Sequence, residues 1–182
     1  AFPHETERLR CASAGPFTYF ASVGRDTGDF GAPADPRFFL PRQLRIVRSG
    51  GRITLVASVA NAVDHAMAAS PDAVAVLLLH DEGARLMTIH PGSFVISESL
   101  FASGAKLRDP AVAVTKDAVE LVWVRDSPRR LEWVRHGIDG VARGAGTLVD
   151  GDVVSPAIAR SGDGILLAYA TTDGGRTSVH VG

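Results

Sequence analysis

Acidic and basic side chains recur as spaced pairs at positions that favour turns in this 182-residue chain. Asp81 precedes Arg85, and Asp126 precedes Arg130 at the same spacing. Glycoside hydrolysis needs two carboxyl groups placed across a sugar, one of which is kept protonated. A catalytic group is usually needed once, however, and these pairs repeat. We therefore expect both of them to be structural ion pairs across a turn.

Ligand binding is the second chemistry that the basic residues suggest. A guanidinium group is a planar fork that binds a carboxylate through two parallel hydrogen bonds. Four arginines follow turn signals at corresponding places in the chain, and we expect them to form a polar collar that holds an acidic or carbohydrate ligand: Arg42, Arg85, Arg130 and Arg176.

An irregular segment between Asp26 and Arg42 interrupts the pattern that the rest of the chain follows. Long loops on a rigid scaffold often carry binding. Its three aromatic residues, Phe30, Phe38 and Phe39, would be costly to leave in water, so they either cover the scaffold or meet a partner. We count them with the four arginines as candidate ligand-binding residues.

No metal or other cofactor is predicted. The six histidines lack the spacing of metal ligands. The stretches 150–152 and 161–164 resemble calcium loops only in composition, because the spaced oxygen series of an EF-hand loop is missing. The sequence also has no glycine loop of the kind that cradles a phosphate before a helix.

The composition of the chain limits the classes of partner that we expect. The formal net charge of −1 gives no general attraction to nucleic acid. Apolar stretches such as Ala73 to Leu79 are far shorter than the roughly 20 residues of a spanning helix, so a transmembrane chain is not expected. Cys11 is alone and forms no internal disulfide. The chain begins at Ala1 without Met, and we expect an exported, extracytoplasmic protein.

The chain repeats itself at about 45 residues, which is the signature of a repeat fold. Residues 64–92 align without a gap on residues 109–137, and a third copy follows at a similar shift. A fainter copy lies upstream. The predicted repeats are approximately 9–63, 64–108, 109–154 and 155–182, all within one domain or domain fragment, 1–182.

Within each repeat, polarity alternates with a period of two over short segments, which favours strands. In the third copy these segments are 111–114, 119–124, 131–135 and 146–149. Four short antiparallel strands recurring at this interval are typical of a β-propeller blade. The predicted fold class is therefore all-β, a β-propeller of about four blade repeats. A pair of β-sandwiches would not explain the repeated unit.

The first strand of a blade lines the crowded propeller axis, and its small residues suit that place. Asp64 and Asp109 open this strand in two copies, where each is expected to cap the turn between blades. The last copy stops within its third strand. Residues 1–8 could supply the missing strand and close a four-bladed ring; otherwise the chain is part of a larger propeller, completed by a second copy or another polypeptide.

Residues 171–177 resemble the Asp-box of the bacterial neuraminidase (sialidase) repeat family, Ser/Thr-x-Asp-x-Gly-x-Thr followed by an aromatic residue. Thr171, Asp173, Gly175 and Thr177 match the pattern, and Ser178 stands where the aromatic residue belongs. In that family the box is a structural turn. The resemblance therefore implies a propeller and says little about catalysis.

A sialidase site, as the same resemblance implies, would also need a tyrosine nucleophile activated by a glutamate. Tyr19 and Tyr169 are the only tyrosines, and both fall in strand interiors, where blade packing explains them. We therefore expect a non-catalytic interaction module that binds a protein or carbohydrate partner through one rim. The alternatives are a propeller-type glycoside hydrolase, sialidase-like, with an incomplete site, and a structural subunit of a homo-oligomer or larger assembly.

Overall fold

The structure is a computed structural model and describes residues 4–26, 42–81, 83–92, 96–102, 106–162 and 164–182. The candidate binding residues Phe30, Phe38 and Phe39 lie outside these ranges. All regular elements in the described part of the chain are strands, and none of its residues forms a helix that could cross a membrane.

Four antiparallel sheets follow one another along the chain. The first contains β1 (His4–Ala14), β2 (Phe17–Asp26), β3 (Gln43–Ser49) and β4 (Ile53–Ala60). The second contains β5 (Ala62–Ala69), β6 (Val74–His80), β7 (Gly83–Ile89) and β8 (Ile96–Phe101). The third contains β9 (Leu107–Val114), β10 (Ala118–Asp126), β11 (Arg129–Gly137) and β12 (Ala142–Asp150). The last contains β13 (Val153–Ser161), β14 (Gly164–Asp173) and β15 (Arg176–Val181).

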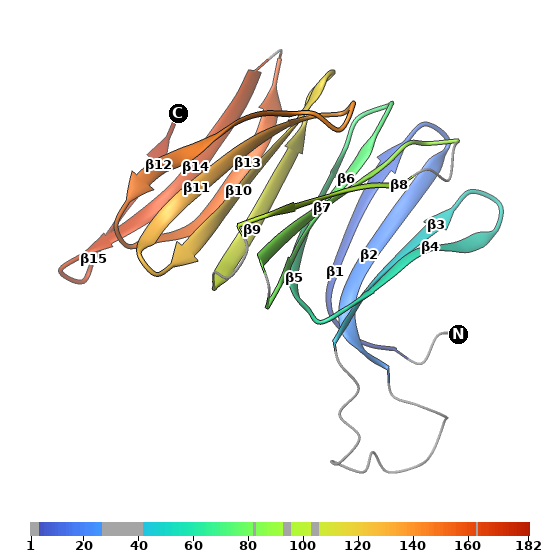
Figure 1. Cartoon of the computed structure of the whole chain (residues 1–182), viewed down its shortest axis with the longest axis horizontal. Helices are drawn as coiled ribbons and strands as arrows, with labels where there is room; N and C mark the ends of the chain where they lie inside the picture. Colours follow the sequence, from blue (N-terminus) through green and yellow to red (C-terminus); the bar gives the residue numbers. More distant parts are fainter. Residues whose placement is uncertain (1–3, 27–41, 82, 93–95, 103–105, 163) are drawn as a thin grey trace, which may run out of the picture.

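Within each sheet, every strand pairs with the next one in the sequence, and the first strand forms the inner edge. The inner strands β1, β5, β9 and β13 lie beside one another in that order, so the sheets fan out as successive blades (Figure 1). Small side chains such as Ala66 and Ala113 allow this close approach. The predicted all-β propeller architecture is confirmed, including the four strands expected in the third copy.

The core lies between the blades because central strands such as β6 and β10 are apolar on both faces. One cluster joins the first and second sheets, with Tyr19 and Leu78 among its members. A second joins the second and third sheets around Leu77 and Trp123. A smaller third cluster joins the third and last sheets around Val122. Every residue of β6 is buried, since neighbouring sheets cover both of its faces.

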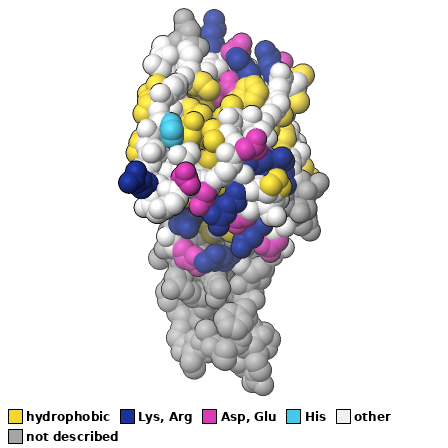
Figure 2. Space-filling view, turned by 90° about the vertical axis from the view of Figure 1, so that its left-hand side faces the viewer, with side chains coloured by type: hydrophobic (Ala, Val, Ile, Leu, Met, Phe, Trp, Pro, Cys, Tyr) yellow, Lys and Arg dark blue, Asp and Glu magenta, His cyan; other side chains and the backbone are white. Residues whose placement is uncertain are grey.

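The last blade has one open face. Leu166, Val179 and Val181 are 45%, 74% and 65% exposed on β14 and β15. In Figure 2, apolar side chains gather over this end of the molecule, with charged side chains below them. The cross-strand pairs Ala170–Val179 and Ala168–Val181 belong to this face. It is the counterpart, one repeat later, of the face through which the third sheet packs on the last sheet.

The expectation that residues 1–8 close the ring is wrong for the described part of that segment. Residues 4–8 belong to β1, which pairs with β2 in the first sheet. Among the described strands, β15 pairs with β14 alone, so the last sheet has three strands. The blade boundaries also shift by a few residues, because the sheets begin at His4, Ala62, Leu107 and Val153. The assignment of residues 1–182 to one domain stays a prediction.

Burial predicts different costs for the same substitution in different blades. Leu78→Ala should lower the free energy of unfolding by about 2–5 kcal/mol, because it leaves a cavity between two blades. Leu166→Ala, on the open face, should cost less than about 1 kcal/mol. Urea unfolding followed by circular dichroism measures both. Equal losses would show that the open face is covered in solution.

Candidate functional site

One rim of the propeller collects most of the charged side chains, and we call it the connection rim. It holds the described parts of the blade-to-blade connections, at 60–62, 101–102, 106–107 and 150–153, together with the turns between the second and third strands of the third and last blades. The strand register places these features at one end, since Ala62 pairs with His80, and Leu107 pairs with Arg125.

The four arginines of the predicted collar all lie at this rim, one in each blade. Three of them bind a carboxylate of their own blade: Arg42 binds Glu7, Arg85 binds Glu98 and Arg130 binds Glu132. Arg176 is exposed and lies across from Asp173 at the start of β15. Their role in ligand binding stays a prediction.

The expected cross-turn ion pairs are wrong. Arg85 turns to Glu98 on β8 instead of Asp81, with an Nη1–Oε2 distance of 3.2 Å. Asp126 pairs with Arg108 of β9, with an Nε–Oδ1 distance of 2.8 Å. Arg130 pairs with Glu132 instead of Asp126. In both hairpins, a neighbouring strand of the same sheet offers a closer partner than the turn does.

Charged residues on the inner strands of three successive blades interact, and we call Arg8, Asp64 and Asp109 the axial cluster. The Arg8 guanidinium of β1 contacts the Asp64 carboxylate of β5. The hydrogen bond and charge of Asp64 raise the pKa of Arg8, and the charge of Asp109 on β9 adds to this effect. A carboxylate from each of two blades therefore acts on one arginine of a third.

The backbone turns the Asp109 side chain out of the regular pattern of its strand. Asp109 has a φ of 51°, in the left-handed region, and sits where the β9–β10 register shifts. Ser155, one repeat later, has the same φ of 51° at the shift in β13. Such bulges re-aim a side chain, and backbone strain of this kind often marks functional sites.

Arg108 links the axial cluster to the rest of the rim. It contacts the carboxylates of Asp109 and Asp126 and donates from Nη2 to the carbonyl oxygen of Val153, at 3.0 Å, in the next blade. Burial works to lower the pKa of Arg108, but the hydrogen bonds from these two carboxylates outweigh it and raise that pKa. Arg108 is thereby held as a cation between two blades.

His65 follows Asp64 in β5, and its side chain is buried. Its Nε2 donates to the carbonyl oxygen of Ala21 at 3.0 Å, so Nδ1 carries no proton, and Nδ1 has no partner among the described residues. Burial lowers the pKa of this imidazole. Asp64 in turn accepts the backbone N–H of His65, its neighbour in β5, at 2.7 Å, and the expected capping of the turn between blades stays a prediction. His65 thus supports the axial cluster from behind, as a neutral ring.

A second charged group surrounds Glu132 on β11. Its Oε2 accepts the indole N–H of Trp123 at 2.7 Å, and its Oε1 accepts from Nε of Arg125 at 2.7 Å and of Arg130 at 2.8 Å. Burial works to raise the pKa of Glu132, but these hydrogen bonds, led by that of Arg125, outweigh it and hold the pKa below its ordinary value.

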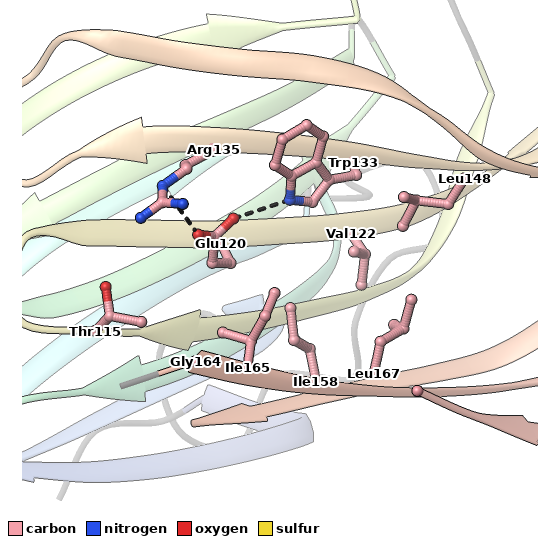
Figure 3. A pocket seen from close by; sticks show the side chains of 11 residues that line it. Thr115, Glu120, Val122, Trp133, Arg135, Leu148, Ile158, Gly164, Ile165 and Leu167 are labelled. Carbon is pink, nitrogen blue, oxygen red and sulfur yellow. Dashed lines mark hydrogen bonds and ion pairs between the residues drawn. The ribbon is translucent and has the colours of Figure 1, made fainter. Parts of the chain in front are cut away.

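Two cavities flank Trp133. The flank cavity, of about 300 Å³, lies between the third and last sheets among Val122, Ile158 and Leu167. Glu120 lies in its wall, where it accepts from Nε1 of Trp133 at 2.8 Å and pairs with Arg135 at 3.2 Å (Figure 3). The rim cavity, of about 370 Å³, lies on the side of the second sheet and is lined by Phe101, Trp123, Arg125, Arg130, Glu132 and Thr147, among others.

The tyrosines have the packing roles expected of them. Tyr19 is buried between the first two blades, and Tyr169 packs on the third cluster and stacks on His180, with ring centroids 4.9 Å apart. Residues 171–177 form a hairpin whose turn residues, Gly174 and Gly175, have positive φ. This hairpin joins the second strand of its sheet to the third, and the resemblance to the sialidase Asp-box is not confirmed.

Sequence reasoning missed Arg8, Arg108 and Glu132 as members of charged clusters. Asp64, the partner of Arg8, comes from another blade, and so does the Val153 carbonyl oxygen that Arg108 binds. The partners of Glu132 come from both strands of one hairpin. A usable signal was the Asp-Pro at 109–110, which recurs as Ser-Pro at 155–156 where the inner strands bulge. Among the described residues, no group of three metal-binding side chains lies together.

The blades and their connection rim define a β-propeller, and comparison with solved structures agrees. The chain resembles the catalytic domain of the GH62 α-L-arabinofuranosidase of Coprinopsis cinerea, with a TM-score of 0.52 and 8% identity over 99% of this chain and 64% of that one. It also resembles a GH43 endo-arabinanase from Bacillus licheniformis, with a TM-score of 0.50 and 12% identity over 98% of this chain and 74% of that one.

A bifunctional GH43-CE protein of Bacteroides eggerthii aligns with a TM-score of 0.52 and 8% identity, over 98% of this chain and 26% of that one. The chain thus spans under two thirds of the arabinofuranosidase domain and of the bifunctional protein. At such identities the likeness shows the fold alone. No family model and no curated protein sequence matches the chain.

The Glu132 group predicts an acid-dependent contribution to stability. Because its pKa is lowered in the folded protein, ionised Glu132 stabilises the fold above the unfolded-state value of about 4.3, and this contribution is lost as pH falls through the lower folded-state pKa. Glu132→Gln should cost about 1–3 kcal/mol at pH 7 and flatten the loss of stability between about pH 5 and pH 3. Urea midpoints measured across this range test it.

The matched control is Glu98→Gln, which removes a more exposed carboxylate bound to one arginine. It should change stability at pH 7 by less than about 1 kcal/mol. An unchanged acid slope in Glu132→Gln would contradict the role given to this carboxylate.

Proposed function

We propose that this chain is a β-propeller module that recognises a carbohydrate at its connection rim. The observation that carries the proposal is the axial cluster, in which Arg8 contacts Asp64 across two blades and Asp109 of the third blade acts on Arg8 through its charge. Fixed donors and acceptors at the axial end of a rigid scaffold suit the hydroxyl groups of a saccharide, which both donate and accept hydrogen bonds.

The likeness to arabinan-active propellers supports this choice of ligand class. Solved structures described as an α-L-arabinofuranosidase and an endo-arabinanase share the fold over nearly the whole of this chain. We therefore place arabinose-containing polysaccharide first among the ligands to be tested. An extracytoplasmic location, where such polymers occur, belongs to the same proposal.

Recognition without hydrolysis is favoured by the state of the described carboxylates. Glycoside hydrolysis needs one carboxyl group free to donate a proton. Asp64 already binds Arg8, and Asp109 binds Arg108, so neither is placed as a proton donor. The second candidate is a propeller-type glycoside hydrolase with an incomplete site, favoured by the presence of two carboxylates on neighbouring inner strands.

Binding to linear arabinan tests the proposal. Asp64→Asn and Asp109→Asn should each weaken binding by about tenfold or more, because each removes a charged hydrogen-bonding group. Asparagine tolerates the positive φ at position 109, so the backbone is retained. Affinity electrophoresis in arabinan-containing gels and calorimetry both measure the change.

The control variant is Asp139→Asn, which removes a carboxylate bound to Arg143 at the opposite rim. It should bind arabinan as the unmodified chain does. If both axial variants also kept full affinity, arabinan recognition by the axial cluster would be excluded.

An assay of reducing sugar released from the same arabinan separates the two candidates. We expect no release by the purified chain. Release that is lost in both Asp64→Asn and Asp109→Asn, and retained in Asp139→Asn, would instead establish the hydrolase.

A further inference from the structure

The residues that line the rim cavity carry more positive than negative charge. Arg125 and Arg130 both donate to the same oxygen of Glu132, so two guanidinium groups share one carboxylate. These three are the charged residues of the lining. Asp150 lies across from Arg130 in the β11–β12 register but does not line the cavity, so the lining itself has one positive charge in excess.

Arg125 is the source of the spare hydrogen-bond donors. Its side chain is 17% exposed, and its Nε is used by Glu132. A guanidinium has five N–H donors, four of which are on its two Nη atoms. In the described part of the chain no acceptor binds these Nη atoms, although the residue lines the cavity. These donors are accessible to solvent, so a ligand in the cavity can reach them.

The remaining walls of the rim cavity are largely apolar, and β12, which forms one of them, has small side chains there. Phe101, Trp123, Trp133 and Val134 line the cavity together with Ala145 and Gly146 of β12. The short β12 side chains leave room beside the indole rings. A volume of about 370 Å³ falls within the range of roughly 300–1,000 Å³ that is common for small-molecule sites.

The flank cavity on the other side of Trp133 provides an internal comparison. Its carboxylate, Glu120, is matched by a single arginine, Arg135, and the rest of its wall is largely aliphatic (Figure 3). In the flank cavity, one negative charge is thus matched by one positive charge. The excess at the rim cavity is therefore a local feature and does not arise merely from an arginine facing a glutamate between blades.

We infer that the rim cavity binds a small organic carboxylate, with the carboxylate group on the Nη donors of Arg125 and an apolar ring or chain against Phe101 and the tryptophans. A bidentate contact between guanidinium and carboxylate satisfies the spare donors and neutralises the excess charge. This site shares no residue with the axial cluster, so it does not depend on the proposed carbohydrate function.

Benzoate and benzamide form a matched pair of probes, because they have the same ring and differ in charge. The chain has two tryptophans, Trp123 and Trp133, and both line the rim cavity. Trp133 also lines the flank cavity, so the indole N–H signal of Trp123 in NMR spectra reports specifically on the rim cavity, and tryptophan fluorescence gives the affinity. Benzoate should perturb both probes and bind at least about tenfold more tightly than benzamide.

Three variants separate the arginine's roles. Arg125→Gln should weaken benzoate binding by about tenfold or more, and Arg125→Lys should weaken it less, since it keeps the charge but loses the fork. Arg143→Gln removes an arginine at the opposite rim and should leave binding unchanged. Circular dichroism checks that each variant is folded.

Equal binding of benzoate and benzamide, or no response of either tryptophan to benzoate, would overturn the inference. Retention of full benzoate affinity in folded Arg125→Gln would also overturn it. If Arg125→Gln does not fold, the comparison of the two probes on the unmodified chain and on Arg125→Lys decides the question. Arabinan binding by the axial cluster is measured separately, so the failure of one proposal leaves the other standing.

Discussion

The second and third sheets of this protein are apolar on both faces, and covering those faces is the constraint from which the rest of the structure follows. The inner strands must be small-chained to meet at the axis, as Ala66 and Ala113 are. The outer parts of the blades carry the bulk that fills the wedge between neighbours, as Leu77 and Trp123 do. The charged rim is possible because this packing holds strands from different blades in fixed positions relative to one another.

The third sheet shows how polar groups are accommodated within such a core. Its two tryptophans each donate to a glutamate on a neighbouring strand, Trp123 to Glu132 and Trp133 to Glu120. The indole rings contribute apolar area while their N–H groups hold the carboxylates in place. Because Glu132 is bound by two arginines and Glu120 by one, the two sides of the same sheet differ in charge and hence in chemistry.

The sequence was sufficient for the fold and insufficient for the site, and the reason is physical. The repeat and its alternating polarity predicted every strand of the third copy, since burial on two sheet faces is written into the order of residues. The partner of a charged side chain cannot be read from the order of residues in the same way. The turn spacing pointed Arg85 to Asp81, but the pairing of β7 with β8 gives it Glu98. Arg8 meets Asp64 only after two blades have packed, and no local pattern encodes that contact.

The uneven coverage of the blades also sets where this protein can come apart. In a linear array of units, each unit is held mainly by its neighbours, so stability adds up along the array and is lowest where one neighbour is lacking. All of β6 is buried, whereas every residue of β15 is exposed. Local unfolding should therefore begin at the last blade and proceed toward the second. Proteases and unfoldases would therefore act first at β15, while the axial cluster was still folded.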